Sequence, residues 1–279
     1  MNTLQLVFVR MFRKPAGILV VVVALAGCSF AAIGDTKLTQ DTINDFNTCL
    51  TEMRAGITQK QSSTQDFVRA IDPARLNSGK TVIGPGADCS KQVQHGRVTH
   101  WIGDVFIPGA NVQDALKVLK DVARYPIVYG PEVVTCPAPR VLSENEETRR
   151  VSLRLEDKVG PFHKIDVVLD GVYEVENGQL DASHIYYTSR SVSIQEVRGS
   201  QDLPEGEGRG YLWRQNTYWR LEQRTNPAGV LAECEIISLS SDPNDLPWPI
   251  SSAADHYSKD LPQTKLEFTL TNTAKAAKP

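Results

Sequence analysis

The side chains best suited to chemistry lie between residues 184 and 235, where polar and apolar residues alternate. His184 and Glu233 are the two candidates for a catalytic acid or base, which must lie within hydrogen-bond reach of a substrate. A surface histidine, or one satisfied within a sheet, is the competing interpretation of His184. The sequence has no Gly-x-Ser-x-Gly nucleophile elbow, and its five histidines share no metal-ligand spacing. We therefore expect no metal ion and no cofactor.

Charged side chains in this region could form a network across neighbouring strands; they are Arg190, Arg214, Arg220, Glu233 and Glu235. If the network is buried, it could orient the polar headgroup of a ligand. If it faces outward, it is a ladder of cross-strand ion pairs, each worth ~0.2–1 kcal/mol. Both interpretations stay open, and Arg190, Arg214, Arg220 and Glu235 are candidate ligand-binding residues.

Four aromatic residues could line an apolar pocket of the kind that small ligands require: Tyr187, Tyr211, Trp213 and Trp219. In an extended strand alternate residues share a face, so the odd-numbered aromatic residues from Tyr211 to Trp219 are expected on one side. Ordinary packing in a hydrophobic core is the competing interpretation. These four residues complete the set of candidate ligand-binding residues.

The strand that carries these aromatic residues belongs to a predicted β-hairpin, because a turn cluster at residues 226–229 separates two runs rich in strand-forming residues. If Thr225 pairs with Val230 across a four-residue loop, Arg220 lies opposite Glu235. A slip of one residue would instead place the hairpin's glutamates beneath the tryptophans. In the preferred register the aromatic face lies opposite small residues, which leaves room for a helix or a ligand.

The remaining elements follow from hydrophobic periodicity. Helices are expected at residues 39–57, from Asn111 to Pro126, and at 262–277. Seven strands are expected: one near 97–108, four near 133–142, 150–157, 162–176 and 181–197, and the two arms of the hairpin. Residues 242–260, with three prolines, are expected to be irregular. This order predicts the α+β class, with an antiparallel sheet that curls around the C-terminal helix.

The N-terminal residues are predicted to be a targeting segment. Three basic residues precede a short apolar run, and residues 25–28 read Leu-Ala-Gly-Cys, which resembles the bacterial lipobox with Cys28 as the lipidated residue. Ser29 follows, which implies sorting to an outer membrane and therefore a periplasmic location. An uncleaved transmembrane anchor is the alternative, although its apolar core is shorter than the ~20 residues that a spanning helix needs.

Composition and cysteine content narrow the function classes further. The 279 residues carry a formal charge of −3, and this balance argues against nucleic-acid binding. In an oxidising compartment, Cys49, Cys89, Cys136 and Cys234 allow three disulfide pairings. Cys49 with Cys89 is our first expectation, because both lie in the N-terminal extension. Cys234 is alternatively a small buried strand residue.

Several segments, taken in order, carry a family resemblance: WIGDVFIPGA at 101–110, residues 125–133, GYLWRQNTYWR at 210–220, ECEIISLS at 233–240 and LPQTKLEFTL at 261–270. Together they resemble the START-like, or SRPBCC, helix-grip superfamily, which includes polyketide cyclases and pollen-allergen-like proteins. Within it, they resemble an uncharacterised group of exported bacterial members. The resemblance implies a deep cavity between sheet and helix that holds lipids or other apolar molecules. The chain departs from the group at residues 241–258, which are polar and broken by prolines.

The sequence thus predicts a lipoprotein signal peptide at 1–27, a helical and irregular extension at 28–94, and a START-like domain at 95–277. The expected function is non-enzymatic binding of a lipid or other hydrophobic small molecule by a protein with an N-terminal lipid anchor. One alternative is a cyclase- or hydrolase-like enzyme that uses His184 or Glu233 in the same cavity. Another is a structural lipoprotein whose pocket is closed. The ligand, the protein partners and the oligomeric state stay open.

Overall fold

The structure is a computed structural model, and it describes residues 35–279 except 69, 73, 75, 77–79, 88, 90–92, 136, 146–147, 160–164, 249 and 260. These residues belong to one compact unit. The predicted signal peptide, the lipidation of Cys28 and any pairing of Cys136 lie outside the described residues. The predicted division at residue 94 stays a prediction.

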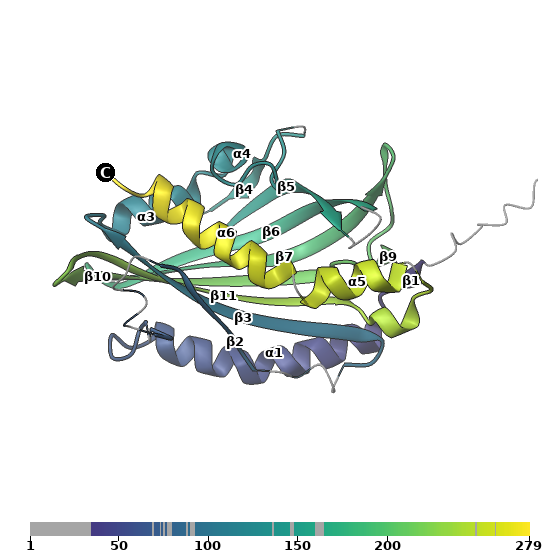
Figure 1. Ribbon diagram of the computed structural model, residues 1–279, viewed down its shortest axis with the longest axis horizontal. Coiled ribbons are helices and arrows are strands. Elements are labelled where there is room, and N and C mark those ends of the chain that lie inside the picture. The colour runs from purple at the N-terminus through teal and green to yellow at the C-terminus, as the bar shows by residue number, and fades with distance from the viewer. Residues whose placement is uncertain are drawn as a thin grey trace, which may run out of the picture. The chain divides into compact units, whose positions relative to one another are not determined.

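The main element is a large antiparallel sheet (Figure 1). Its strands, from one edge to the other, are β2 (Val82–Pro85), β3 (Gly96–Pro108), β11 (Ala228–Ser241), β10 (Arg214–Thr225), β7 (His184–Arg198), β6 (Ile165–Asp181), β5 (Thr148–Val159) and β4 (Arg140–Glu144). The short strand β8 (Gln201–Asp202) pairs with β7, and β1 (Thr36–Lys37) pairs separately with β9 (Glu207–Gly208). The α+β class is confirmed. Within the described part of the chain, β1, β2, β8 and β9 add to the seven expected strands.

Helix α6 (Leu261–Ala276) lies across one face of this sheet, which we call the inner face (Figure 1). Leu266 and Leu270 recur at a spacing of four, so they share one side of the helix, and both are fully buried. The helix comes close to β3 at Gly103, where an added Cβ atom would lie 2.6 Å from the Leu270 Cδ1 atom. The predicted helix-grip arrangement is therefore confirmed, and a glycine allows the close packing of helix and sheet.

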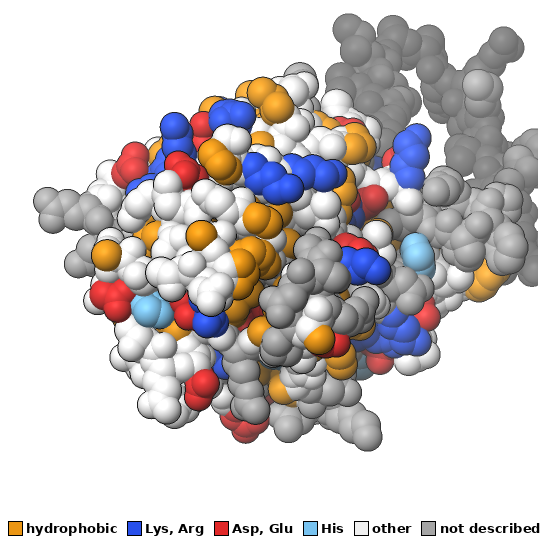
Figure 2. All heavy atoms as spheres, turned by 60° about the vertical axis from the view of Figure 1, so that its left-hand side comes forward, with side chains coloured by type: hydrophobic (Ala, Val, Ile, Leu, Met, Phe, Trp, Pro, Cys, Tyr) orange, Lys and Arg blue, Asp and Glu red, His pale blue; other side chains and the backbone are white. Residues whose placement is uncertain are grey.

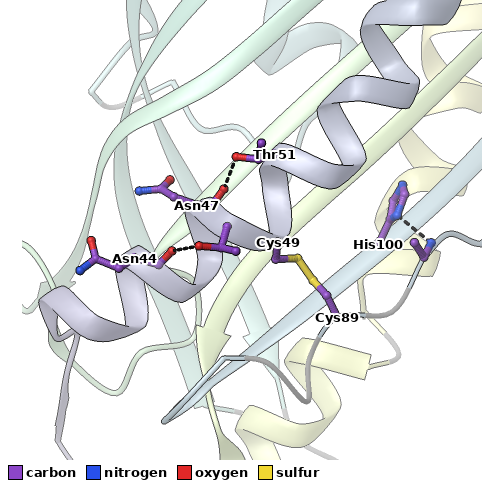
Figure 3. Close-up of a disulfide and its surroundings, with 8 residues drawn as sticks. Asn44, Asn47, Cys49, Thr51, Cys89 and His100 are labelled. Carbon is purple, nitrogen blue, oxygen red and sulfur yellow. Dashed lines mark hydrogen bonds between the residues drawn. A yellow bond between two sulfur atoms is a disulfide. The ribbon is translucent and has the colours of Figure 1, made fainter.

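Helix α1 (Gln40–Gln61) packs on the opposite, outer face of the sheet, where Phe46 and Leu50 contact a cluster that includes Ile237 and Leu239. The Thr39 side chain caps the helix by accepting a hydrogen bond from the Thr42 backbone N–H. Cys49 on α1 forms a disulfide with Cys89 (Figure 3), which confirms the pairing that we expected first.

The remaining helices are shorter than α1 and α6. Asn111 caps α3 (Val112–Lys120), as predicted, and η2 (Val122–Arg124) and α4 (Tyr125–Val128) follow it. The prediction of an irregular segment at 242–260 was wrong, because η3 (Pro243–Asp245) is followed by α5 (Ile250–Lys259). All three prolines precede the first residue of α5, so they do not interrupt it. Among the described residues, no helix is long and apolar enough to cross a membrane.

The β10–β11 hairpin is present, but its register differs from the predicted one by two residues. Thr225 pairs with Ala228 and not with Val230, because residues 226–227 form a two-residue connection in place of the expected four-residue loop. A shift of two residues leaves each strand side chain on its predicted face, since the side-chain period of a strand is two.

Candidate functional site: a cavity between the sheet and the C-terminal helices

A cavity of about 220 Å³ lies between the inner face of the sheet and helices α5 and α6. Its apolar walls come from alternate residues of β5, β6, β7 and β10, among them Leu153, Leu169, Tyr187 and Trp219. Trp219 pairs in register with Tyr187 on one side and with Cys234 on the other. Cys234 is small and fully buried, and burial raises the pKa of its thiol. Tyr187 and Trp219 line the cavity, whereas Cys234 does not.

Uncharged polar side chains form a row across the inner face, which we call the polar row: Ser189, Thr217, Gln215, Ser238 and Thr99. Ser238 pairs in register with both Gln215 and Thr99, so the three side chains lie side by side on three adjacent strands. The Ser238 hydroxyl is 2.7 Å from the Thr99 hydroxyl. The cavity therefore offers neutral hydrogen-bonding groups within an apolar wall.

Three charged residues that line the cavity are partly exposed, and we call them the mouth triad: Glu132, Asp157 and Lys265. Their side chains are 21–25% exposed. The Lys265 ammonium lies 2.6 Å from Asp157 Oδ2 and 3.0 Å from Glu132 Oε1. Burial raises the pKa of Glu132, and the charge of Lys265 opposes this effect. On the face drawn in Figure 2, hydrophobic side chains (orange) lie among charged ones.

The structure divides the eight candidate ligand-binding residues between the two faces of the sheet. Tyr187, Tyr211 and Trp219 line the cavity. Their role in binding stays a prediction. The other five do not line the cavity; they are Trp213, Arg190, Arg214, Arg220 and Glu235.

Trp213 is buried on the outer face, where it packs in one cluster with Phe46 of α1 and Tyr218 of β10. Alternation along an extended strand predicts that Trp213 shares a face with Trp219, but β10 begins only at Arg214. Regular alternation holds within a strand, so it does not extend to Trp213. The predicted common face of the two tryptophans is therefore wrong.

The arginine and glutamate candidates also lie on the outer face. Arg190 forms an ion pair with Glu176, and Arg214 Nη2 lies 2.6 Å from Glu205 Oε1. Both arginines border a second, polar hollow of about 220 Å³ between α1 and the sheet. They are therefore on the wrong side of the sheet to contact a molecule in the main cavity.

The candidates at the centre of the outer face form a buried network around Arg220, which is 0% exposed. Arg220 pairs in register with Glu233, not with Glu235 as predicted, and it forms ion pairs with both carboxylates. His100 Nε2 lies 2.8 Å from Glu235 Oε1, and the Lys60 ammonium lies 3.8 Å from Glu233. The interpretation as a buried network is therefore correct for Arg220, Glu233 and Glu235, whereas Arg190 and Arg214 form separate, partly exposed ion pairs. The network faces away from the cavity, however, so it does not orient a ligand there.

Asp104 lies beside this network, because it pairs in register with Glu233 across β3 and β11. Its Oδ2 atom accepts a hydrogen bond of 2.6 Å from the Ile71 backbone N–H. Burial raises the pKa of Asp104 from 3.8 to about 6, although the hydrogen bond from Ile71 and the charge of Arg220 lower it. Asp104 thus connects residues 70–72 to the outer face at the cost of burying a carboxylate.

The raised pKa of Asp104 predicts a pH-dependent effect of Asp104→Asn. Because the pKa is higher in the folded state, the stability linked to this group is present below pH 3.8 and is lost as the pH rises through about 6. Asparagine can still accept from Ile71 but does not ionise, so the variant should gain up to ~3 kcal/mol over wild type between about pH 4 and 7. Denaturant unfolding of both proteins at a series of pH values measures this difference.

Glu235 titrates in a separate window. Burial alone would raise its pKa, but the hydrogen bond from His100 and the charge of Arg220 lower it to about 2. The stability linked to Glu235 is therefore present above pH 4.5 and lost as the pH falls through about 2. A difference between Asp104→Asn and wild type that is the same at pH 5 and pH 7.5 would contradict the assignment to Asp104.

The two candidate catalytic residues lie outside the cavity. His184 is on the outer face, where its Nδ1 atom is 2.8 Å from Asp181 Oδ1 and its ring packs edge-on against Phe67. Glu233 belongs to the buried network. Neither can exchange a proton with a molecule in the cavity, so the enzyme alternative loses both of its candidates. Among the residues that the structure describes, no group of three or more His, Cys, Asp or Glu side chains could hold a metal ion.

The polar row and the mouth triad were not among the predicted site residues. The polar row has a local signal, because Gln215 and Thr217 alternate with outward-facing charged and aromatic residues of β10. The mouth triad has none, because Lys265 lies more than a hundred residues after Glu132 and Asp157. Its members meet only when α6 crosses the sheet.

An antiparallel sheet that grips a C-terminal helix and encloses an apolar cavity defines an α+β helix-grip protein with room for a small hydrophobic ligand. No protein-family model matches the sequence, and a comparison with curated proteins gives no match. Among solved structures, the chain is similar to human STARD10, with 10% identity, 75% of this chain and 82% of that chain covered, and a TM-score of 0.42.

Two further solved structures are similar over most of their length. The human StarD13 (DLC2) lipid transfer and protein localization domain has 11% identity, 74% of this chain and 93% of that chain covered, and a TM-score of 0.40. A hypothetical protein from Helicobacter pylori has 13% identity, 76% and 97% covered, and a TM-score of 0.40. Similarities at these TM-scores establish no function, so we base the function on this chain's own cavity.

Proposed function

We propose that this protein is a START-like, non-enzymatic binding protein for a hydrophobic small molecule, which it holds between the sheet and α6. The observation that carries the proposal is the unfilled cavity with a largely apolar wall that includes Tyr187 and Trp219. Burial of about 300 Å² of apolar ligand surface contributes about 7 kcal/mol, which corresponds to a micromolar dissociation constant before the costs of association. A few polar groups then set the orientation of the ligand.

We further propose that the protein is exported and tethered by a lipid on Cys28 to an outer membrane, facing the periplasm. The lipobox-like residues 25–28 support this location. Metabolic labelling of growing cells with an alkyne fatty acid tests the tether. Wild type should become labelled and partition with outer membranes, whereas Cys28→Ala should do neither. Label on the Cys28→Ala variant would contradict the assignment.

The binding proposal is tested by filling the cavity. Thr217 lines the cavity from β10, so Thr217→Phe adds a ring inside it. We expect wild type to bind the neutral dye N-phenylnaphthylamine saturably and Thr217→Phe to bind it at least about tenfold more weakly, a loss of about 1.4 kcal/mol. Dye fluorescence titration gives both affinities.

Thr225→Phe is the matched control, because Thr225 is an exposed residue at the end of the same strand. Its affinity for the dye should stay within about twofold of wild type. If wild type binds no dye, and native mass spectrometry of gently purified protein finds no bound small molecule, the proposal fails. A structural protein with a closed pocket would then be the better description.

A further inference from the structure

The volume of the cavity limits the part of a ligand that it can enclose. About 220 Å³ is less than the ~300–1,000 Å³ of typical sites for drug-sized molecules. Fully buried Leu266 and Leu270 occupy the space between α6 and β3, so the helix is already seated against the sheet at Gly103. Only a compact molecule, or one short chain of a larger one, fits inside.

The charges on the wall are unfavourable for an anion. Among the described residues, the charged side chains that line the cavity are those of the mouth triad, and their formal charges sum to −1. Lys265 already contacts both carboxylates, at 2.6 and 3.0 Å. Burial raises the pKa of the Tyr187 phenol, and the charge of Arg149 opposes this effect, but Arg149 pairs with Glu144 and is not part of the lining.

The remaining polar groups of the wall are neutral. The polar row supplies hydroxyl groups and one amide, which can both donate and accept hydrogen bonds. Burial raises the pKa of the Tyr211 hydroxyl, and the nearby Arg209 opposes this effect. Groups of this kind match a hydroxyl or carbonyl group and cannot neutralise a carboxylate or phosphate.

From the volume, the charges and the polar row together, we infer that the ligand is a compact amphiphile without a negative charge. It is either neutral, with a hydroxyl or carbonyl group that bonds to the polar row, or cationic, with its charge beside the carboxylates of the mouth triad. The site discriminates against carboxylates and phosphates. This inference rests on the proposed function and specifies the chemical class that the same cavity selects.

Three molecules with the same ten-carbon chain test the inference: decanol, decylammonium and decanoate. Each is titrated at pH 7 against wild-type protein loaded with N-phenylnaphthylamine, and displacement of the dye gives the affinity. We expect decanol and decylammonium to displace the dye at least about tenfold more effectively than decanoate, because a like charge near the partly buried carboxylates is repelled. Decanoate that binds as well as decanol would overturn the inference.

Variants that remove charges then test whether the mouth triad causes the preference against anionic ligands. In the double variant Glu132→Gln and Asp157→Asn, Lys265 has lost both carboxylates. The ratio of the affinity for decanoate to the affinity for decanol should therefore rise at least about tenfold. Asp166→Asn is the matched control. It removes one negative charge from a residue that is paired with Lys158, has a 71% exposed side chain and does not line the cavity. The ratio of the two affinities should therefore stay at the wild-type value.

A second substitution keeps the test valid if the double variant does not fold. Lys265→Gln leaves both carboxylates and removes their counter-charge, so it should shift the ratio further against decanoate. An unchanged ratio in both Lys265→Gln and the double variant would overturn the role of the mouth triad. These outcomes differ from failure of the proposed function, in which neither the dye nor any of the three molecules binds.

Discussion

Arg220→Met lowers the free energy of unfolding by about 3–5 kcal/mol, the range for breaking a buried ion pair by removing one partner. Arg220 is 0% exposed, and it is paired with Glu233 and Glu235, whose side chains are at most 5% exposed. The substitution leaves two carboxylates on the buried outer face, where Lys60 and His100 are the only other basic partners that the described contacts give them. Equilibrium unfolding in urea at pH 7 measures the loss.

Arg224→Met is the matched control for this prediction. Arg224 is on the same strand and pairs with Glu222 at 3.1 Å, but its side chain is 43% exposed. An exposed ion pair contributes at most about 1 kcal/mol, so the control should change stability by no more than that. If Arg220→Met loses no more stability than Arg224→Met, the buried network does not stabilise the fold. Dye binding by folded Arg220→Met should match wild type, because Arg220 faces away from the cavity.

Loss of the disulfide is the second large effect. Replacing Cys49 and Cys89 together by alanine should lower the free energy of unfolding by about 2–4 kcal/mol, because the unfolded chain is no longer constrained by a closed loop. The two cysteines are 40 residues apart in sequence, and the bond ties α1 to the segment before β3. Thermal and urea unfolding of the double variant and of wild type give the difference.

Reduction provides the control for this substitution. A thiol reductant that breaks the bond should lower the stability of wild type towards that of the double variant, and it should leave the double variant unchanged. Because α1 covers the outer face, the dye affinity of the folded double variant should stay within about twofold of wild type. A double variant as stable as wild type would show that the bond does not constrain the unfolded chain.

The fold could be predicted from the sequence where the local hydrophobic periodicity or a turn signal was strong. The four- and three-residue spacing of Leu266, Leu270, Ala274 and Ala277 predicted α6, and the turn cluster at 226–229 predicted the hairpin. The hairpin register was wrong by two residues, because the pairing of charges gives the correct face of each strand but does not fix which of two glutamates lies opposite Arg220. Three prolines favour an irregular segment at residues 242–260, but α5 begins after the last of them, so the prediction did not include this helix.

The site was harder to predict from the sequence, because it depends on contacts between segments that are distant in the chain. Trp219 lines the cavity, as alternation along β10 predicts, but Tyr211 and Trp213 both precede β10, and of these two only Tyr211 lines the cavity. The candidate arginines lie on the outer face, where they form ion pairs and do not line the cavity. Which face of a sheet encloses a cavity is decided by where α1 and α6 dock, and strand periodicity alone does not contain that information.

The contacts of Lys265 also bear on how quickly a ligand can leave. Lys265 connects α6 to Asp157 on β5 and to Glu132 after α4, and all three residues line the cavity. Partly exposed ion pairs are weakened by dissolved salt. Release of a ligand should therefore become faster as ionic strength rises, even where the affinity for an uncharged ligand changes little, and the residence time would then depend on the surroundings of the protein.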